Sequence, residues 1–157
     1  MSSTKPVPLR ILVIEDDADQ RRLVRAALVA GGHIVAREIE RGDDPSLLAD
    51  PDVDVAVVDL NLPGMGGIDV IRALLDKRPS LPVLVLSASA HSAAITEALL
   101  AGALGYVVKG ARFQELLDSI EMVARRRPAL SAQAEGALRA SNSEDVDRAV
   151  ARVRRWL

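Results

Sequence analysis

The chain has 157 residues, a formal net charge of -2 and no cysteine, and its length is typical of one domain. The absence of cysteine excludes disulfides, thiolate metal sites and cysteine nucleophiles, and the near-balanced charge gives no general basic field for nucleic acid or an anionic membrane. No apolar run is long enough to cross a membrane and the N-terminus lacks a signal-peptide core, so we expect a cytoplasmic protein without membrane contact. Lysine and aromatic residues are rare, with three of each: Lys5, Lys77, Lys109, Tyr106, Phe113 and Trp156.

From residue 9 to about 127, short apolar runs alternate with longer segments of helical period, the pattern of βαβ units around a parallel sheet. The first, third and fourth runs are almost continuously Val, Ile and Leu, as expected for central strands covered by helices on both faces. In the second run apolar residues alternate with polar ones, so this strand is predicted to lie at an edge of the sheet. The fold is therefore predicted to be a doubly wound α/β sheet of five strands, at 9–14, 33–39, 53–60, 82–88 and 104–108.

Apolar residues at three and four spacing predict the helices between these strands. The first helix is predicted to end at Gly31 and Gly32, which suit a left-handed helix terminus, and the second, around Asp44 to Asp50, is short. Three further helices are predicted at 68–75, 95–102 and 113–124. The face of the first helix predicted to point inward consists of Leu23, Ala26, Ala27 and Ala30.

The regular pattern ends at the arginines of 125–127 and at Pro128. We therefore divide the chain into an N-terminal arm at 1–8, an α/β domain at 9–127, and a linker with a short amphipathic helical tail at 128–157. A first short helix is predicted from Ser131 to about Ala140. Ser143 is predicted to cap a second, with acidic residues at its positive start and arginines at its negative end, as the helix dipole favours. Its apolar face would hold Val146, Val150, Val153 and Leu157.

Residues with reactive side chains follow several of the predicted strands. In open parallel sheets, ligands bind outside the carboxyl ends of the strands, so these residues are expected to meet at one edge. An acidic turn after the first strand would repel phosphate and attract a hard cation, Mg²⁺ or Mn²⁺, although the acids could instead only cap the next helix. The residues concerned are Glu15, Asp16 and Asp17 after the first strand, Asp59 after the third, Ser87 after the fourth, and Tyr106 and Lys109 at the fifth.

Asp59 is a possible nucleophile, because an Asp oxygen beside a divalent cation can attack phosphorus and form an acyl phosphate. Lys109 could pair with Asp59 and later bind a phosphoryl oxygen, and Ser87 could donate its hydroxyl to the same group. Each residue also has an ordinary structural explanation. Asp59 and Ser87 could cap the loop and strand end where they stand, and Lys109 could extend to solvent.

From about Leu9 to Arg127 the chain resembles a response-regulator receiver domain of the CheY-like fold, and in particular the NarL/FixJ class of two-component regulators. The resemblance rests on ILVIEDD, VVDLNLPGMGG, PVLVLSAS, AGALGYVVKGA and FQELLDSI, which occur in the family's order. It implies a flavodoxin-like sheet with strand order 2-1-3-4-5. It also implies roles for individual residues: Asp59 as phosphoacceptor, Glu15 and Asp16 as the acidic pair, the backbone carbonyl of Asn61 as a further Mg²⁺ ligand, Lys109 as the phosphate-binding lysine, and Ser87 and Tyr106 as the switch pair.

The resemblance further implies a histidine kinase or phosphotransfer protein as phosphodonor. The acyl phosphate would draw Ser87 inward and let Tyr106 enter the vacated space, which changes the surface made by 95–102, 104–108 and 113–124. Output would then pass through that surface, or through the C-terminal helix, to a partner protein or a second copy of the chain. The helix-turn-helix that follows receivers of the NarL/FixJ class does not fit after Ser131, so no direct contact of this chain with nucleic acid is expected.

Several alternatives stay open from sequence. The chain could be the receiver part of a DNA-binding regulator of the NarL/FixJ type, cut or decayed after its linker, or a docking module that is never phosphorylated. An Asp-nucleophile phosphohydrolase of the haloacid dehalogenase type would need a second acid two residues after the nucleophile, where this chain has Asn61. We therefore expect no enzyme, beyond self-phosphorylation from small phosphodonors and loss of the phosphoryl group by hydrolysis.

Overall fold

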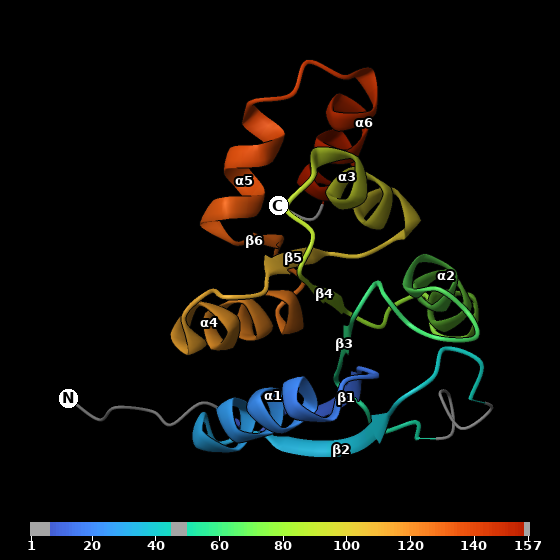
Figure 1. The fold of residues 1–157 in the computed structure, drawn as a ribbon, viewed down its shortest axis with the longest axis vertical. Helices are drawn as coiled ribbons and strands as arrows, with labels where there is room; N and C mark the ends of the chain where they lie inside the picture. The colour runs from blue at the N-terminus through green and yellow to red at the C-terminus, as the bar shows by residue number, and fades with distance from the viewer. Residues whose placement is uncertain (1–6, 45–49, 156–157) are drawn as a thin grey trace.

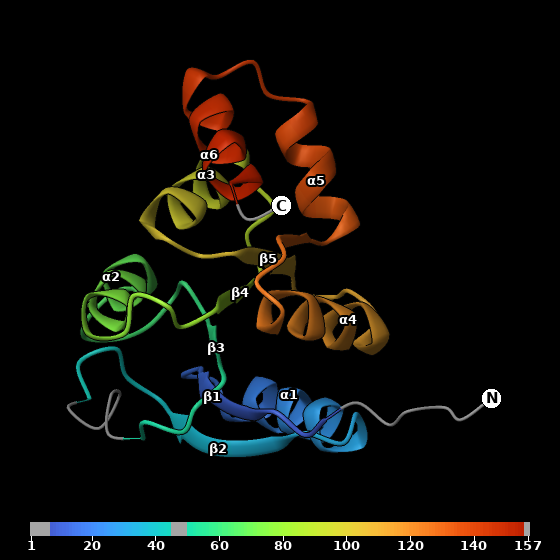
Figure 2. The ribbon, with the colours of Figure 1, turned by 180° about the vertical axis from the view of Figure 1, so that it is seen from behind.

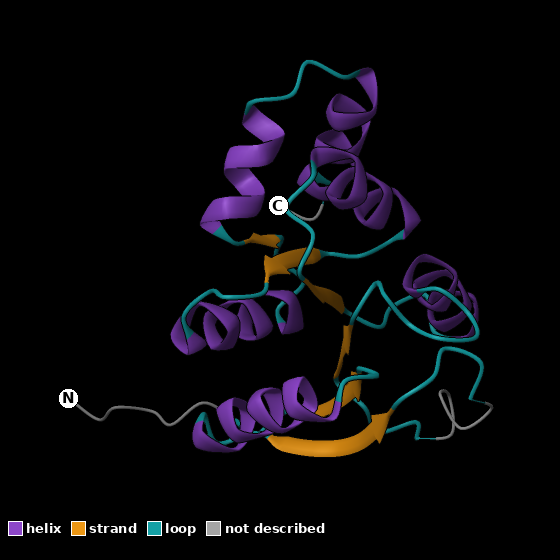
Figure 3. Ribbon diagram, viewed as in Figure 1, coloured by secondary structure: helices purple, strands orange, loops and turns teal. Residues whose placement is uncertain are grey.

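The structure of the chain is a computed structural model that describes residues 7–44 and 50–155. One parallel sheet lies between two layers of helices, and two further helices lie beyond one edge of it (Figures 1 and 3). The elements, in chain order, are β1 Arg10–Ile14, α1 Ala18–Ala30, β2 Ile34–Ile39, β3 Val55–Val58, α2 Gly67–Lys77, β4 Val83–Ser87, α3 Ser92–Ala101, β5 Gly105–Val108, α4 Phe113–Ala124, β6 Ala129–Leu130, α5 Ala132–Arg139 and α6 Glu144–Arg154.

The strands are hydrogen-bonded in the order β2-β1-β3-β4-β5-β6, and every pair is parallel. The predicted order of the first five strands and the edge position of β2 are confirmed. The predicted count of five was one strand short, because β6 pairs with the outer side of β5. There Ala129 N–H donates to Leu104 O at 3.3 Å and Ser131 N–H to Tyr106 O at 2.9 Å. A strand of two residues after Pro128 has no periodicity that a sequence pattern could reveal.

Two apolar clusters, one on each face of the sheet, form the core. Helices α1 and α4 cover one face, and α2 and α3 cover the other (Figures 1 and 2). Strands β1, β3, β4 and β5 supply side chains to both clusters, which explains why their sequences are almost continuously apolar. This arrangement fixes the carboxyl ends of β1, β3, β4 and β5 side by side at one edge of the core.

The inward faces of the helices agree with the predicted ones in part. In α3, Ile95, Ala98 and Leu99 are fully buried, as predicted. In α1 the predicted face was wrong, because the helix buries Val24, Ala27 and Leu28 and leaves the side chain of Leu23 51% exposed. An alanine-rich helix offers more than one apolar stripe, and only the packed sheet selects between them. The short helix predicted around Asp44 to Asp50 falls largely on 45–49, outside the described residues.

Helix α1 begins and ends as the sequence indicates. The side chain of Asp17 accepts a hydrogen bond from Gln20 N–H at 2.9 Å, and the chain turns after the helix at Gly32, which has a φ of 86°. The capping interpretation of the acidic turn therefore applies to Asp17. It leaves the carboxylates of Glu15 and Asp16 available for another role.

The residues after 127 pack onto the rest of the protein. Helix α6 lies against α3, and α5 lies beside β5 and α3, in both views of the ribbon (Figures 1 and 2). Their buried side chains belong to the same apolar cluster as α3, namely Ala134, Leu138, Val146, Ala149 and Val153. Ser143 caps α6 as predicted, accepting a hydrogen bond from Asp145 N–H at 3.1 Å. Within 7–44 and 50–155, no helix is long and apolar enough to cross a membrane.

Candidate functional site

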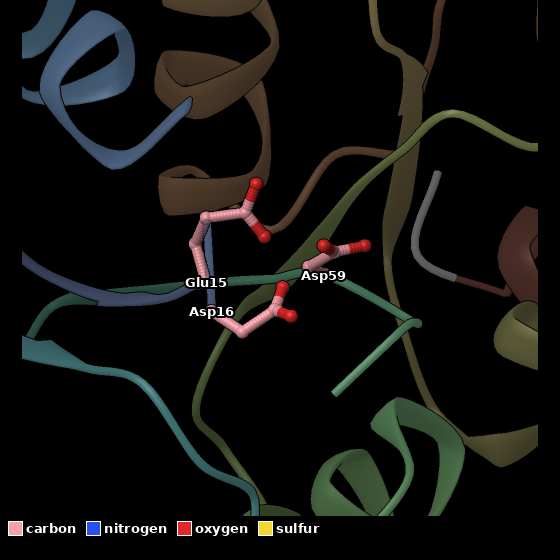
Figure 4. Close-up of side chains that lie close together, drawn as sticks. All are labelled: Glu15, Asp16 and Asp59. Atoms are coloured by element: carbon pink, nitrogen blue, oxygen red, sulfur yellow. The ribbon is translucent and has the colours of Figure 1, made fainter. Parts of the chain in front are cut away.

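Three carboxylates meet at the ends of β1 and β3. Glu15 and Asp16 follow β1 and Asp59 follows β3, and their side chains extend into a common space (Figure 4). Parallel pairing fixes this arrangement, since Glu15 N–H donates to Ile39 O and Asp59 N–H to Ile14 O, each at 2.9 Å. Glu15 and Asp59 are buried and Asp16 is exposed, so the cluster opens to solvent on the side of Asp16.

Lys109 reaches this cluster from the end of β5. Its Nζ donates to Oε1 of Glu15 at 2.7 Å and to Oδ2 of Asp59 at 3.2 Å. Its backbone N–H donates to the carbonyl of Ser87 at 2.8 Å, which continues the β4–β5 pairing and fixes the start of the side chain. The rare lysine at this strand end is therefore an ion-pair partner of two buried acids, and does not simply extend to solvent.

Burial and charge shift two pKa values in this cluster. Burial, together with the neighbouring Asp59, raises the pKa of Glu15 from 4.5 to about 7, against the opposing effect of Lys109. Burial lowers the pKa of Lys109, but the hydrogen bond to Glu15 and the charges of both acids outweigh it, and the net shift is upward. The lysine is therefore charged at neutral pH, and one positive charge faces more than one carboxylate.

The donor atoms fit a hard divalent cation. One oxygen from each of Glu15, Asp16 and Asp59 lies within 4.8 Å of the others, and Mg²⁺ takes oxygen ligands in an octahedron. Oε2 of Glu15 is buried without a hydrogen-bond partner among the described residues, so the cluster has an acceptor left for such an ion. The backbone N–H of Asn61 donates to Oδ1 of Asp59 at 3.2 Å, which places Asn61 next to the cluster.

Arg21 on α1 is a site residue that no sequence pattern indicated. Its Nη1 donates to the backbone carbonyls of Glu15 at 2.9 Å and Asp16 at 3.3 Å, and its Nη2 to Oε1 of Glu40 at 3.1 Å. The guanidinium thus ties the acidic turn to α1 and to the residue after β2. No sequence signal distinguishes this arginine, because the chain has seventeen of them.

Ser87 and Tyr106, the two remaining residues singled out from sequence, lie under the site. Both are fully buried. The Oγ of Ser87 accepts a hydrogen bond from Ser89 N–H at 3.2 Å, and the Tyr106 hydroxyl donates to the Ser89 carbonyl at 2.8 Å. Burial raises the pKa of Tyr106, and its interactions with Ser87 and Ser89 oppose that rise. The tyrosine ring therefore lies inside the core, linked to the loop that follows Ser87.

Known proteins are similar to this chain in sequence and in fold. The response regulator receiver domain family matches residues 11–121. The two-component response regulator PhoP of Pseudomonas aeruginosa is 36% identical over 118 residues, covering 75% of this chain and 52% of that protein. The chemotaxis protein CheY of the same organism is 37% identical over 121 residues, covering 75% of this chain and 98% of that protein.

Among solved structures, the crystal structure of a LuxR-family two-component response regulator from Aurantimonas sp. SI85-9A1 is similar, with a TM-score of 0.81 and 28% identity. The similarity covers 85% of this chain and 97% of that one. Of the two relatives named above, the chain spans about half the length of PhoP and nearly all of CheY.

Proposed function

This chain belongs to the response regulator receiver family of two-component systems, and on that premise we propose that Asp59 accepts a phosphoryl group from the phosphohistidine of a histidine kinase or phosphotransfer protein. The observation that carries the proposal is the bridge from Lys109 to both Glu15 and Asp59, with Asp16 beside them. It supports the proposal because a carboxylate that could act as the nucleophile, a charged lysine and a cluster of oxygen atoms suited to a cation lie at the same edge of the sheet.

The reaction exchanges one bond at phosphorus for another. A carboxylate oxygen of Asp59 attacks the phosphorus, the P–N bond to the donor imidazole breaks, and its electron pair stays on that nitrogen. Lys109 is placed to bind a phosphoryl oxygen, and the Ser87 hydroxyl to bind another after a small movement of its loop. When bound, Mg²⁺ would neutralise charge on the transferred group, held by Asp16, Asp59 and the Asn61 carbonyl with Glu15 adjacent. Positioning and charge suffice, because phosphoryl transfer scarcely needs a general base.

An exposed apolar groove beside Lys109 supports a protein as the donor. The groove, of about 520 Å³, lies between α1 and the start of α4, and Lys109 lines it. Leu23 and Phe113 on its walls are 51% and 57% exposed, so two large apolar side chains from neighbouring helices face solvent in the same groove. A donor protein bound in this groove would lie next to Lys109, which contacts Asp59, and would bring its histidine to that carboxylate. The exposed side chains of Leu23 and Phe113 would then form part of the interface with the donor.

We propose the same acyl phosphate as the signal that the chain transmits. A phosphoryl group held by Lys109 and Ser87 would fix the loop after β4, to which the Tyr106 hydroxyl is bonded. This would favour the packing in which Tyr106 is buried over one in which it is not. We infer that the chain acts as a phosphoacceptor and switch with protein partners, and that any turnover is limited to self-phosphorylation and hydrolysis of its own acyl phosphate.

Acetyl phosphate with Mg²⁺, followed by intact-mass measurement and peptide mapping, tests the proposal. The wild type should gain one phosphoryl group, mapped to Asp59, and the Asp59→Asn variant should stay unmodified. Asp69→Asn is a matched control, since Asp69 lies exposed in the first turn of α2, and it should be modified like the wild type. A phosphoryl group on another residue would contradict the assignment.

A further inference from the structure

A cavity of about 470 Å³ lies where α2, α3 and the start of α6 meet. Helix α3 contacts both of the others and lies between them in the fold (Figures 1 and 2). The volume falls within the range of about 300–1,000 Å³ that is typical of small-molecule sites. None of the reactive residues at the strand ends lines this cavity, so the chemistry proposed at Asp59 gives it no role. It is therefore a candidate for a second site.

The floor of the cavity includes a buried hydroxyl group. Thr96 and Val146 are the two buried residues among those that line the cavity. Thr96 is only 5% exposed, and its Oγ1 has no hydrogen-bond partner among the described residues. A threonine within a helix takes either of two rotamers, and leaving its buried hydroxyl unpaired costs free energy. A polar ligand in the cavity would therefore gain a hydrogen bond from Thr96 after rotation about its Cα–Cβ bond.

Positive charge at the cavity favours an anionic group of the ligand. The first turns of α3 and α6 both line the cavity, and no side chain caps the start of α3. Amide groups at a helix start, together with the helix dipole, attract negative charge. Arg72 on α2 adds a guanidinium group to the same cavity. Its Nη1 donates to Oδ1 of Asp69 at 3.4 Å, which leaves further N–H donors for a ligand.

Two carboxylates line the same cavity, which disfavours a simple anion. Glu97 on α3 and Asp145 on α6 are both exposed at its mouth. An anion would meet these two acids, whereas a simple cation would meet Arg72 and two helix starts. A ligand with one charge of each sign can match both groups of charges at once. The charges of the cavity therefore fit a zwitterion.

We propose that this cavity is a second binding site of the chain, and that its ligand is a small zwitterion of the size and charge of a free amino acid. The ligand carboxylate would lie at the start of α3 beside Arg72, and its ammonium group beside Glu97 or Asp145. A polar atom of the ligand would pair with the Thr96 hydroxyl, and Leu100 on the wall would contact its apolar part. The site does not depend on the proposed phosphorylation, so it gives the chain a separate input.

Titration of the full chain with the standard L-amino acids, one at a time at millimolar concentration, tests the proposal through amide chemical shifts. At least one amino acid should bind saturably and shift the amides of 92–97 and 141–146. Acetate and ethylammonium each carry one of the two charges, and each should bind about ten-fold or more weakly than that amino acid, because it loses the charged hydrogen bonds of the other group. The proposal is wrong if no amino acid shifts these amides, or if either singly charged probe binds as tightly.

Two substitutions and a matched control then locate the ligand. Thr96→Val keeps the shape of the side chain without its hydroxyl, and should weaken binding of the amino acid about five-fold. Arg72→Gln should weaken it about ten-fold or more, because a charged partner of the carboxylate is lost. Arg22→Gln should leave it unchanged, since Arg22 pairs with an acid three residues earlier, as Arg72 does, but lies on α1 away from the cavity. Wild-type affinity in both Thr96→Val and Arg72→Gln would overturn the proposal, and because Arg72 is exposed, its result stands whether or not Thr96→Val folds.

Discussion

The ammonium group of Lys109 donates its shorter hydrogen bond to Glu15, at 2.7 Å, although the two residues are 94 positions apart in the chain. The side chain of Glu15 is only 5% exposed, so this ion pair lies at the bottom of the acidic cluster. A buried pair of this kind is costly unless its remaining charges are matched. The single lysine faces a cluster of three carboxylates, so a divalent cation bound there would offset the remaining negative charge.

Replacing Lys109 with methionine should slow phosphorylation of Asp59 by acetyl phosphate about 100-fold, the loss typical when a group that stabilises transition-state charge is removed. The methionine side chain is unbranched and only one atom shorter than that of lysine, but it has no charge and cannot donate a hydrogen bond to a phosphoryl oxygen. The time course of intact mass measures the rate. Lys77→Met, at the exposed end of α2, is the control and should react like the wild type. An unchanged rate in Lys109→Met would remove the lysine from the proposed reaction.

The pKa of Glu15 predicts how stability depends on pH in the absence of metal. Because that pKa rises from its ordinary value of 4.5 to about 7 in the folded protein, the fold binds a proton between these pH values that the unfolded chain releases. The stabilisation from the protonated carboxyl is complete below about pH 4.5 and is lost as pH rises through about 7. Urea unfolding at several pH values, compared with Glu15→Gln, isolates this contribution. A difference between the two proteins that is constant from about pH 5 to pH 8 would contradict it.

Arg21→Ala should weaken Mg²⁺ binding about ten-fold, because residues that orient metal ligands typically contribute ten- to hundred-fold to affinity. The guanidinium holds the backbone of Glu15 and Asp16, so its loss frees the acidic turn. Chemical-shift titration with Mg²⁺ measures the affinity. Arg25→Ala removes a neighbouring arginine that bonds to Glu38 and not to the turn, and it should bind Mg²⁺ normally. Equal affinities in the two variants would show that Arg21 only stabilises the fold.

Ser131→Ala should lower the free energy of unfolding by about 2 kcal/mol, at the upper end for an N-cap. The Oγ of Ser131 caps α5 and also accepts from Val108 N–H, so the substitution leaves a buried strand amide without its partner. Ser143→Ala removes an exposed cap from α6 and should cost about 1 kcal/mol or less. Urea unfolding measures both. A larger loss in Ser143→Ala would mean that β6 and α5 do not brace β5.

The sequence by itself determined the first five strands and the residues expected at their carboxyl ends, whereas the order of those strands came from the resemblance to receiver domains. Apolar periodicity is a local property, and parallel pairing brings every strand's carboxyl end to one edge. Asp59 and Lys109 could therefore be placed on that edge without coordinates, although they lie on strands separated in the sheet by β4.

Only the tertiary structure decided which contacts these residues make. Three features depend on segments far apart in the chain: the inward face of α1 at Val24 and Leu28, the hydrogen bonds of Arg21, and the Glu15 oxygen that has no hydrogen-bond partner among the described residues. The pairing of β6 and the packing of α6 on α3 also depend on the tertiary structure. A two-residue strand has no periodicity, and the sequence of an amphipathic helix shows its apolar face but not the surface against which that face packs. Local patterns record which side of an element is apolar, whereas the partner of that side is set by packing of the whole chain.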